Sequence, residues 1–358
     1  MRKSFKIMPR NFATAFAALV LVGSAAGAET AANPAMPGEI LKAAPAGDWV
    51  SIAPSDLVVM TLAPDADAKP RRVVIQLLPA PFSQGWIGNI RRLAALHWWD
   101  ASAIYRVQDN FVAQFGDPDE DTPKAKPLPA GLAAVPESAY TYDPIAHDAV
   151  QKFVAQLFSP ADHFRSEARQ KALDEALSQA KSGKPRLDLY SSLADVQRAD
   201  SYAPFTAFFK DFPIALSASE AWPIHCYGTI GVGRNNSPDT GTGAELYAVI
   251  GTPPRQLDRN IAVVGRVIEG MEYLSGLPRG PAPMGMYNDK AKNTPILSIR
   301  LASELPEGAQ PRLQYLSTES ASFAAYVHAR VNRRDAFYIY ASGSADICNI
   351  PVPIRPAP

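Results

Sequence analysis

Two short strand-forming runs separated by a turn, within residues 100–117, constrain the fold of this chain more than any other stretch. Residues 104–107 and 111–115 are rich in β-branched and aromatic side chains, which fit the pleated, half-buried surface of a sheet. Residues 108–110 read Gln-Asp-Asn, a composition typical of turns. The stretch therefore predicts two strands joined by a turn.

This stretch also places a lone Arg106 close to an aromatic residue, Phe111, and an amide, Gln114. Residues two apart on a strand share a face. Phe111 and Gln114 are three apart, so they share a face only where the pleat is interrupted or where a groove reaches both. Taken alone, the stretch is more typical of an exposed strand arginine beside core aromatics, with a purely structural role.

Regular elements are predicted on both sides of it. Strands are predicted at 56–62 and 72–78, and a helix with apolar residues at helical spacing at 86–96. After residue 117 come a Pro-rich loop, helices starting near Asp143-Pro144 and Ser159-Pro160, and a loop with several aromatics at 202–212. The apolar faces of these helices must pack on something, which predicts a helical insertion that either supports the rest of the fold or selects substrates.

The central stretch resembles the core of the cyclophilin-type peptidyl-prolyl isomerases, whose pattern reads F-H-R-x-x-x-x-F-x-x-Q-G-G-D. Tyr105-Arg106, Phe111, Gln114 and Gly116-Asp117 fall at the same offsets. Other segments that resemble family motifs occur in the family's order, over roughly residues 55–117 and 226–302: Asn89–Leu93, Trp99-Asp100, Gly228–Gly233, Thr242–Tyr247, Leu257-Asp258 and Val263–Met271.

The resemblance implies a mainly β fold: a closed eight-stranded antiparallel cyclophilin-like barrel with capping helices. It divides the chain into a cyclophilin-like domain at 49–302, interrupted by the helical insertion at 118–225, and a C-terminal α/β extension at 303–358 packed on the barrel. Within this extension the sequence predicts a helix at 320–334 and a short strand at Phe337–Tyr340.

The implied activity is peptidyl-prolyl cis–trans isomerisation, which requires no cofactor and no metal. Rotation about an X–Pro bond must overcome the conjugation of the amide, and a catalyst has to bind the twisted amide better than either planar form. By resemblance, the catalytic residues are Arg106, Phe111 and Gln114. The implied substrate-binding residues are Val112, Arg234, Glu245, Tyr247 and Leu257.

Several of these positions depart from the family pattern. Arg234 replaces an Asn, Glu245 a Gln and Val112 a Met, and Gln256 stands where an aromatic residue, often Trp, is usual. These departures leave a second function open, that of a non-catalytic peptide-binding or chaperone module on the same barrel.

The N-terminus reads as a cleavable secretory signal peptide at 1–28, followed by a flexible leader at 29–48. It combines basic residues before position 11, an apolar run at 12–22 and the small residues Ala26-Gly-Ala28. Its removal takes four basic residues and lowers the formal net charge from 0 to −4. We therefore expect a periplasmic protein with no stable membrane anchor after cleavage and no nucleic-acid partner, acting on proline-containing, unfolded or partly folded exported proteins.

Cys226 and Cys348 are the only cysteines. In an oxidising compartment such a pair predicts one disulfide bond. Neither residue has a second ligand at zinc spacing, although His225 adjoins Cys226.

Overall fold

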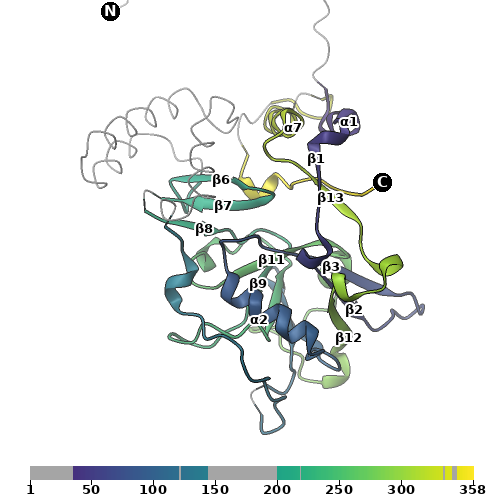
Figure 1. The fold of residues 1–358 in the computed structure, drawn as a ribbon, viewed down its shortest axis with the longest axis vertical. Helices are drawn as coiled ribbons and strands as arrows, with labels where there is room; N and C mark the ends of the chain where they lie inside the picture. Colours follow the sequence, from purple (N-terminus) through teal and green to yellow (C-terminus); the bar gives the residue numbers. More distant parts are fainter. Residues whose placement is uncertain (1–34, 121, 144–199, 218, 334, 341–344) are drawn as a thin grey trace, which may run out of the picture. The chain divides into compact units, whose positions relative to one another are not determined.

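The computed structural model describes residues 35–120, 122–143, 200–217, 219–333, 335–340 and 345–358 (Figure 1). The predicted signal peptide and the predicted helices after Asp143 lie outside these residues. Within them, no helix is long and apolar enough to cross a membrane.

Eight strands form a closed barrel in which every neighbouring pair is antiparallel. Their order around the barrel is β10-β5-β4-β12-β2-β3-β11-β9. Closure leaves no unpaired edge that could pair with another chain. This confirms the predicted barrel. Its strands are β2 (Leu57–Leu62), β3 (Arg71–Leu77), β4 (Ala103–Val107), β5 (Val112–Gly116), β9 (Thr229–Val232), β10 (Leu246–Val249), β11 (Val263–Glu269) and β12 (Thr294–Leu301).

Strands β2 and β3 are buried on both faces, which explains their nearly continuous apolar sequence. Val58, Met60 and Leu62 belong to the main core inside the barrel. Leu57 and Val59, on the opposite face, belong to a second cluster outside it. Because alternate residues of a strand point to opposite faces, an apolar residue is needed at almost every position.

Helix α2 (Gln84–Ala95) packs against this core along its apolar face, with Trp86, Ile90 and Leu93 fully buried. The indole Nε1–H of Trp86 donates to the carbonyl oxygen of Thr240 at 3.0 Å, so the helix is also fixed to the loop before β10. A second, short helix, α6 (Glu272–Ser275), follows β11. The 3-10 turns are η1 (Ala46–Asp48), η2 (Pro54–Asp56), η3 (Glu137–Tyr140), η4 (Arg255–Leu257), η5 (Lys290–Lys292), η6 (Ala302–Glu304), η7 (Glu307–Ala309) and η8 (Ile347–Asn349).

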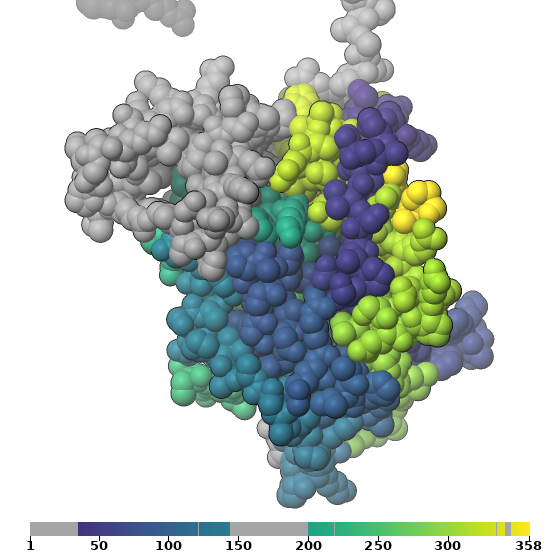
Figure 2. All heavy atoms as spheres, viewed as in Figure 1, coloured from purple at the N-terminus to yellow at the C-terminus, as the bar shows by residue number. Residues whose placement is uncertain are grey.

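A small sheet outside the barrel joins the two ends of the described chain. Its order is β1 (Trp49–Ser51), β13 (Leu313–Leu316) and β14 (Ile354–Pro356). Helix α7 (Ala321–Val331) packs near it, beside the short helix α1 (Pro37–Ala43), and Figure 2 shows these N- and C-terminal segments side by side. The C-terminal extension is therefore α/β, as predicted, and β1 pairs with it although the predicted barrel domain begins at residue 49.

Three local predictions differ from the structure. Residues 37–43 of the predicted flexible leader form α1, because Ile40 and Leu41 pack against the apolar cluster around α7. The predicted loop at 202–212 contains strands instead, and the new sheet is β6 (Phe205–Phe209), β7 (Phe212–Leu216) and β8 (Ala221–Pro223). Its aromatics are split between two packing surfaces: Phe209 lies in the main core and Phe208 lies edge-on to Phe323 of α7, with ring centroids 5.3 Å apart.

The third difference is the predicted strand at Phe337–Tyr340, which does not form. These four side chains are 84, 41, 89 and 86% exposed. With no neighbouring strand among the described residues to pair with, high β-propensity is insufficient to form a strand, because propensity reflects packing on a sheet more than an intrinsic backbone preference.

Cys226 and Cys348 form the predicted disulfide bond, and no free cysteine remains. The bond joins the C-terminal extension to the segment immediately before β9, across a sequence separation of 122 residues.

Candidate active site

The β4–β5 hairpin brings Arg106 and Gln114 directly opposite each other. The pairing register shifts between Ile104 and Arg106, which is the kind of irregularity that re-aims a side chain. Phe111 precedes the first residue of β5 and lies in the turn, where its backbone N–H donates to the carbonyl oxygen of Gln108 at 3.2 Å. The turn frees Phe111 from the strand's alternation, so both Phe111 and Gln114 can lie near the guanidinium of Arg106.

Three hydrogen bonds hold the guanidinium of Arg106. Its Nε–H donates to the carbonyl oxygen of Met284 at 2.7 Å, Nη1–H donates to Oε1 of Gln114 at 2.9 Å, and Nη2–H donates to Oε1 of Gln108. Its Cζ lies 5.9 Å from the centroid of the Phe111 ring. A guanidinium has five N–H donors. Among the described residues three are engaged, so two remain for a ligand.

An apolar cluster adjoins this arginine and contains four of the predicted pocket residues. We call it the Phe111 cluster: Phe111, Val112, Tyr247, Val249, Leu257 and Ile261. Val112, Tyr247 and Val249 are buried, whereas Phe111, Leu257 and Ile261 are partly exposed and form its accessible part. The cluster combines the turn before β5, β5 itself, β10, and η4 with the segment that follows it, so residues far apart in the chain build one apolar surface.

Glu245 does not present its carboxylate as a simple substrate ligand. Its Oε1 accepts a hydrogen bond from the backbone N–H of Asp117, and its Oε2 lies 2.7 Å from the phenolic oxygen of Tyr105. The same phenolic oxygen lies 2.9 Å from Oε1 of Glu120 and accepts from Nε2–H of Gln114 at 2.7 Å. Burial, reinforced by the negative charge of Glu120, raises the pKa of Glu245 to about 8.

The contacts of the Tyr105 hydroxyl require that one of the two carboxyl groups carries a proton. The phenol has one proton to donate and two lone pairs to accept with. If Glu245 and Glu120 were both ionised, the single phenolic proton could serve only one of them, and the other carboxylate would lie against the phenolic oxygen with no proton between them. A protonated Glu245 supplies it by donating to Tyr105, which then donates to Glu120. A chain of hydrogen bonds thus runs from Glu245 through Tyr105 and Gln114 to Arg106.

Arg234 is placed away from this chain. Its Nε–H and Nη2–H both donate to the carbonyl oxygen of Asn260, at 3.0 and 2.8 Å, and Nη1–H donates to that of Asn235. These partners differ from those of Arg106, so the second arginine does not compete for them. It adds a fixed positive charge at a loop that follows β9.

Tyr105 and Met284 are among the contributors to this site that sequence patterns missed. Tyr105 was visible only as the residue before Arg106, and its role depends on contacts with residues up to 140 positions away. Met284 contributes a backbone carbonyl, which no side-chain pattern can reveal.

The comparisons with known proteins decide the family. The family described as cyclophilin-type peptidyl-prolyl cis-trans isomerase/CLD matches residues 86–301, which is more than half of the chain. The chain belongs to the cyclophilin-type peptidyl-prolyl cis-trans isomerases. This cyclophilin is therefore a peptidyl-prolyl isomerase, and β2 and β3, which precede the matched residues, complete its barrel.

One solved structure agrees with this fold. The cyclophilin AquaCyp293 from Hirschia baltica has a TM-score of 0.53 at 19% identity, and the match covers 86% of this chain and 92% of that one. A cyclophilin-type peptidyl-prolyl cis-trans isomerase from Cryptosporidium parvum has a TM-score of 0.34 at 11% identity, over 68% of this chain and 97% of that one. The second likeness is too low to support a conclusion. No curated protein matches this cyclophilin.

Proposed function

We propose that this cyclophilin isomerises X–Pro bonds in exported proteins, with Arg106 as the catalytic residue and the Phe111 cluster as the pocket for the proline ring. The observation that carries the proposal is the placement of Arg106. Three bonds fix its guanidinium beside Phe111, and two N–H donors remain for a ligand among the described residues.

The chemistry follows from the electronic structure of the amide. In the planar forms the nitrogen lone pair is conjugated with the carbonyl, and it becomes a hydrogen-bond acceptor only when the bond is twisted. A donor aimed at the prolyl nitrogen therefore stabilises the twisted state more than either planar state, which is the requirement for catalysis. An arginine suits this role because it remains charged and its donors are held in a planar fork.

The Phe111 cluster would hold the proline ring while the preceding carbonyl rotates. Its accessible part is apolar, and the pyrrolidine ring has an apolar surface, so their contact is favoured by removal of both from water. Gln114 takes a positioning role in this scheme, because its Oε1 is engaged by Arg106 and its Nε2 by Tyr105. One N–H of its amide remains for a substrate carbonyl in this arrangement.

The role in exported proteins is supported by two features. The first 28 residues have the pattern of a cleavable signal peptide. The Cys226–Cys348 disulfide is of a kind that persists in oxidising compartments. Folding of proline-containing chains in such a compartment is slowed by X–Pro isomerisation, which takes tens of seconds or more without a catalyst.

The test is an exchange-NMR measurement on the chain lacking residues 1–28, with an Ala-Pro-containing tetrapeptide as the probe. The parent protein should accelerate cis–trans exchange. Arg106→Ala should reduce this acceleration by roughly ten- to a hundredfold, the equivalent of one charge-assisted hydrogen bond, and leave peptide affinity nearly unchanged. Equal acceleration by parent and folded variant would remove Arg106 from the mechanism. Binding by the parent without acceleration would instead favour a non-catalytic peptide-binding module.

The cellular part of the proposal needs a separate measurement. Refolding of an exported protein whose slow phase is limited by X–Pro isomerisation should be accelerated by the parent and much less by Arg106→Ala. An unchanged slow phase with a parent that is active on the peptide would reject folded-chain clients and leave the peptide activity standing.

A further inference from the structure

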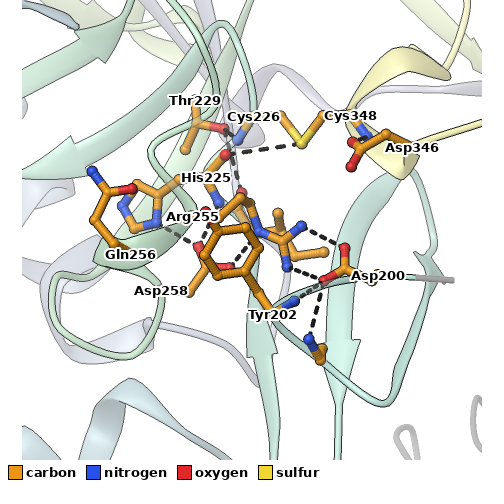
Figure 3. A network of polar contacts seen from close by, with 12 residues as sticks. Asp200, Tyr202, His225, Cys226, Thr229, Arg255, Gln256, Asp258, Asp346 and Cys348 are labelled. Carbon is orange, nitrogen blue, oxygen red and sulfur yellow. Dashed lines mark hydrogen bonds and ion pairs between the residues drawn. A yellow bond between two sulfur atoms is a disulfide. The ribbon is translucent and has the colours of Figure 1, made fainter. Parts of the chain in front are cut away.

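A buried polar network, drawn in Figure 3, contacts the Phe111 cluster at Tyr247, and its residues have had no part in the proposed reaction so far. Nε2 of His225 lies 3.0 Å from the hydroxyl of Tyr247, and Nδ1 lies 2.9 Å from Oδ1 of Asp258. Oδ2 of Asp258 accepts from Nε–H of Arg255 at 2.6 Å. Arg255 in turn donates through Nη1–H and Nη2–H to Asp200, at 2.6 and 3.2 Å.

The network is almost completely removed from solvent. The side chains of His225, Asp258, Arg255 and Asp200 are only 0, 4, 4 and 2% exposed. Buried charges are costly unless each is paired and hydrogen-bonded. Arg255 meets this condition by lying between the two carboxylates, as Figure 3 shows, so the network is a rigid unit.

The direction of each hydrogen bond follows from the acceptors. Oδ1 of Asp258 accepts from the backbone N–H of His225 and faces the Nδ1 atom of the same residue. A carboxylate can only accept, so Nδ1 must carry a proton. In the neutral imidazole Nε2 is then the acceptor, and the hydroxyl of Tyr247 donates to it. His225 therefore fixes the hydroxyl end of the Tyr247 ring, which lies nearly parallel to the imidazole at an interplanar angle of 12°.

The same network fixes a second wall of the cluster. Leu257 is the last residue of η4, which begins at Arg255, and Asp258 follows it directly. Because Arg255 and Asp258 are bonded to each other, the backbone that carries Leu257 is held on both sides. Two walls that come from different parts of the chain, Tyr247 and Leu257, thus share one polar support.

The far end of the network lies outside the barrel. Asp200 also accepts from the backbone N–H groups of Tyr202 and Ala203, at the start of the segment that leads into β6. His225 is adjacent to Cys226, whose disulfide partner Cys348 belongs to the C-terminal extension. The end of the insertion and the extension therefore both reach the support of the cluster.

We infer that His225, Asp258, Arg255 and Asp200 are positioning residues for the proline pocket, through which the segments outside the barrel set the geometry of Tyr247 and Leu257. This inference rests on the proposed function of the Phe111 cluster. It predicts that breaking the network weakens binding of proline peptides while the rate of isomerisation of bound peptide stays nearly constant. Loss of Arg106 should do the opposite.

The experiment measures peptide affinity and exchange of bound peptide by NMR, with the same Ala-Pro-containing tetrapeptide, for Tyr247→Phe, His225→Gln and Asp200→Asn. Each variant should weaken affinity by about three- to tenfold, as expected for one hydrogen bond lost from a supporting network, with less than about a twofold change in bound exchange. Glu220→Gln is a matched acid-to-amide control, because Glu220 forms an exposed pair with Arg259 at 3.5 Å, and it should bind like the parent.

The double variant His225→Gln with Tyr247→Phe separates positioning from general stability. If His225 acts through the hydroxyl, the double variant should bind peptide no more weakly than Tyr247→Phe alone. Parent-like affinity in folded Tyr247→Phe and His225→Gln would overturn the inference, whatever the behaviour of Asp200→Asn. Failure of the parent to accelerate exchange would count against the proposed function, whereas the affinity comparison would still decide the positioning role.

Discussion

Side chains in the candidate site are hydrogen-bonded to one another in the absence of substrate. Gln114 uses its carbonyl for Arg106 and its amide for Tyr105, which fixes the orientation of the amide group. Such preorganisation lowers the conformational entropy that the side chains lose on substrate binding, and it keeps the hydrogen-bond donors in a fixed geometry. The replacement of the family's Gln by Glu245 adds a carboxyl group with a pKa of about 8 to this chain of hydrogen bonds.

That replacement predicts a pH effect on stability. The pKa of Glu245 is raised from its ordinary value of 4.5 to about 8 by burial and by Glu120. Between these two values the folded protein holds a proton that the unfolded chain has released, so the free energy of unfolding falls as pH rises towards 8 and through it. The stabilising contribution is fully present only below pH 4.5.

Glu245→Gln should flatten this decline, because the amide can donate to Tyr105 at every pH. Urea unfolding midpoints at about pH 5 and about pH 9 provide the measurement, and the difference between them should be smaller in the variant. An identical difference in parent and variant would mean that Glu245 already ionises normally in the folded protein.

At the scale of elements, the loop between α6 and β12 supports the β4–β5 hairpin that carries Arg106. The carbonyl oxygen of Gly285 accepts from the backbone N–H of Val107 at 2.8 Å, while the neighbouring Met284 binds Arg106. Gly285 has a φ of 73°, and a Cβ placed there would lie 2.5 Å from the Cα of Gln108. Only glycine permits this close approach of the loop to β4.

Gly285→Ala should therefore displace the loop and loosen Arg106. We expect a loss of isomerase activity of about tenfold or more, with destabilisation of roughly 1–3 kcal/mol from the strained backbone. Gly308→Ala is the matched control, because a Cβ at Gly308 meets nothing within 4 Å. Activity assays and urea unfolding of both variants test the expectation. Equal activity in the two variants would show that Met284 is not needed to hold Arg106.

The elements that sequence reasoning located well are those with strong local signals. β2 and β3 are apolar runs separated by a break at residues 65–70, and α7 shows its buried residues Phe323, Tyr326 and Val327 at helical spacing. The aromatic residues at 202–212 led to the wrong prediction of a loop. They pack on two different surfaces, so their spacing shows no single apolar face. Conversely, Phe337–Tyr340 has strand-forming residues, but it pairs with no strand in the part of the chain that the structure describes.

The site was predictable where it depends on side-chain types at fixed spacing, and not where it depends on distant contacts. Arg106, Phe111 and Gln114 lie within nine positions, and the structure brings Tyr247 and Leu257 to the same place. The contact between Arg106 and Met284 spans 178 positions and uses a backbone atom. The network behind Tyr247 uses ordinary His, Asp and Arg residues whose proximity only the folded chain creates.

At the scale of the whole molecule, the Cys226–Cys348 bond should be a major source of stability. By the chain-entropy relation, closing a loop of 122 residues stabilises the folded state by about 4–5 kcal/mol at most. Urea unfolding of Cys348→Ser should show a midpoint well below that of the parent, and reductant should lower the parent's midpoint to a similar value. Overlapping curves for parent and variant would indicate that the extension is held by packing alone.

The sheet β1-β13-β14 also dictates an order of events during synthesis. Trp49 pairs with Leu316, and Leu313 pairs with Pro356, so the sheet cannot close until residue 356 has been made and has left the ribosome. Every barrel strand is made before that moment, since the last of them ends at Leu301. The growing chain therefore has all the strands of its catalytic barrel while the outer face of β2 and β3 still lacks its cover, and a stalled or truncated product would leave that apolar face open to other chains.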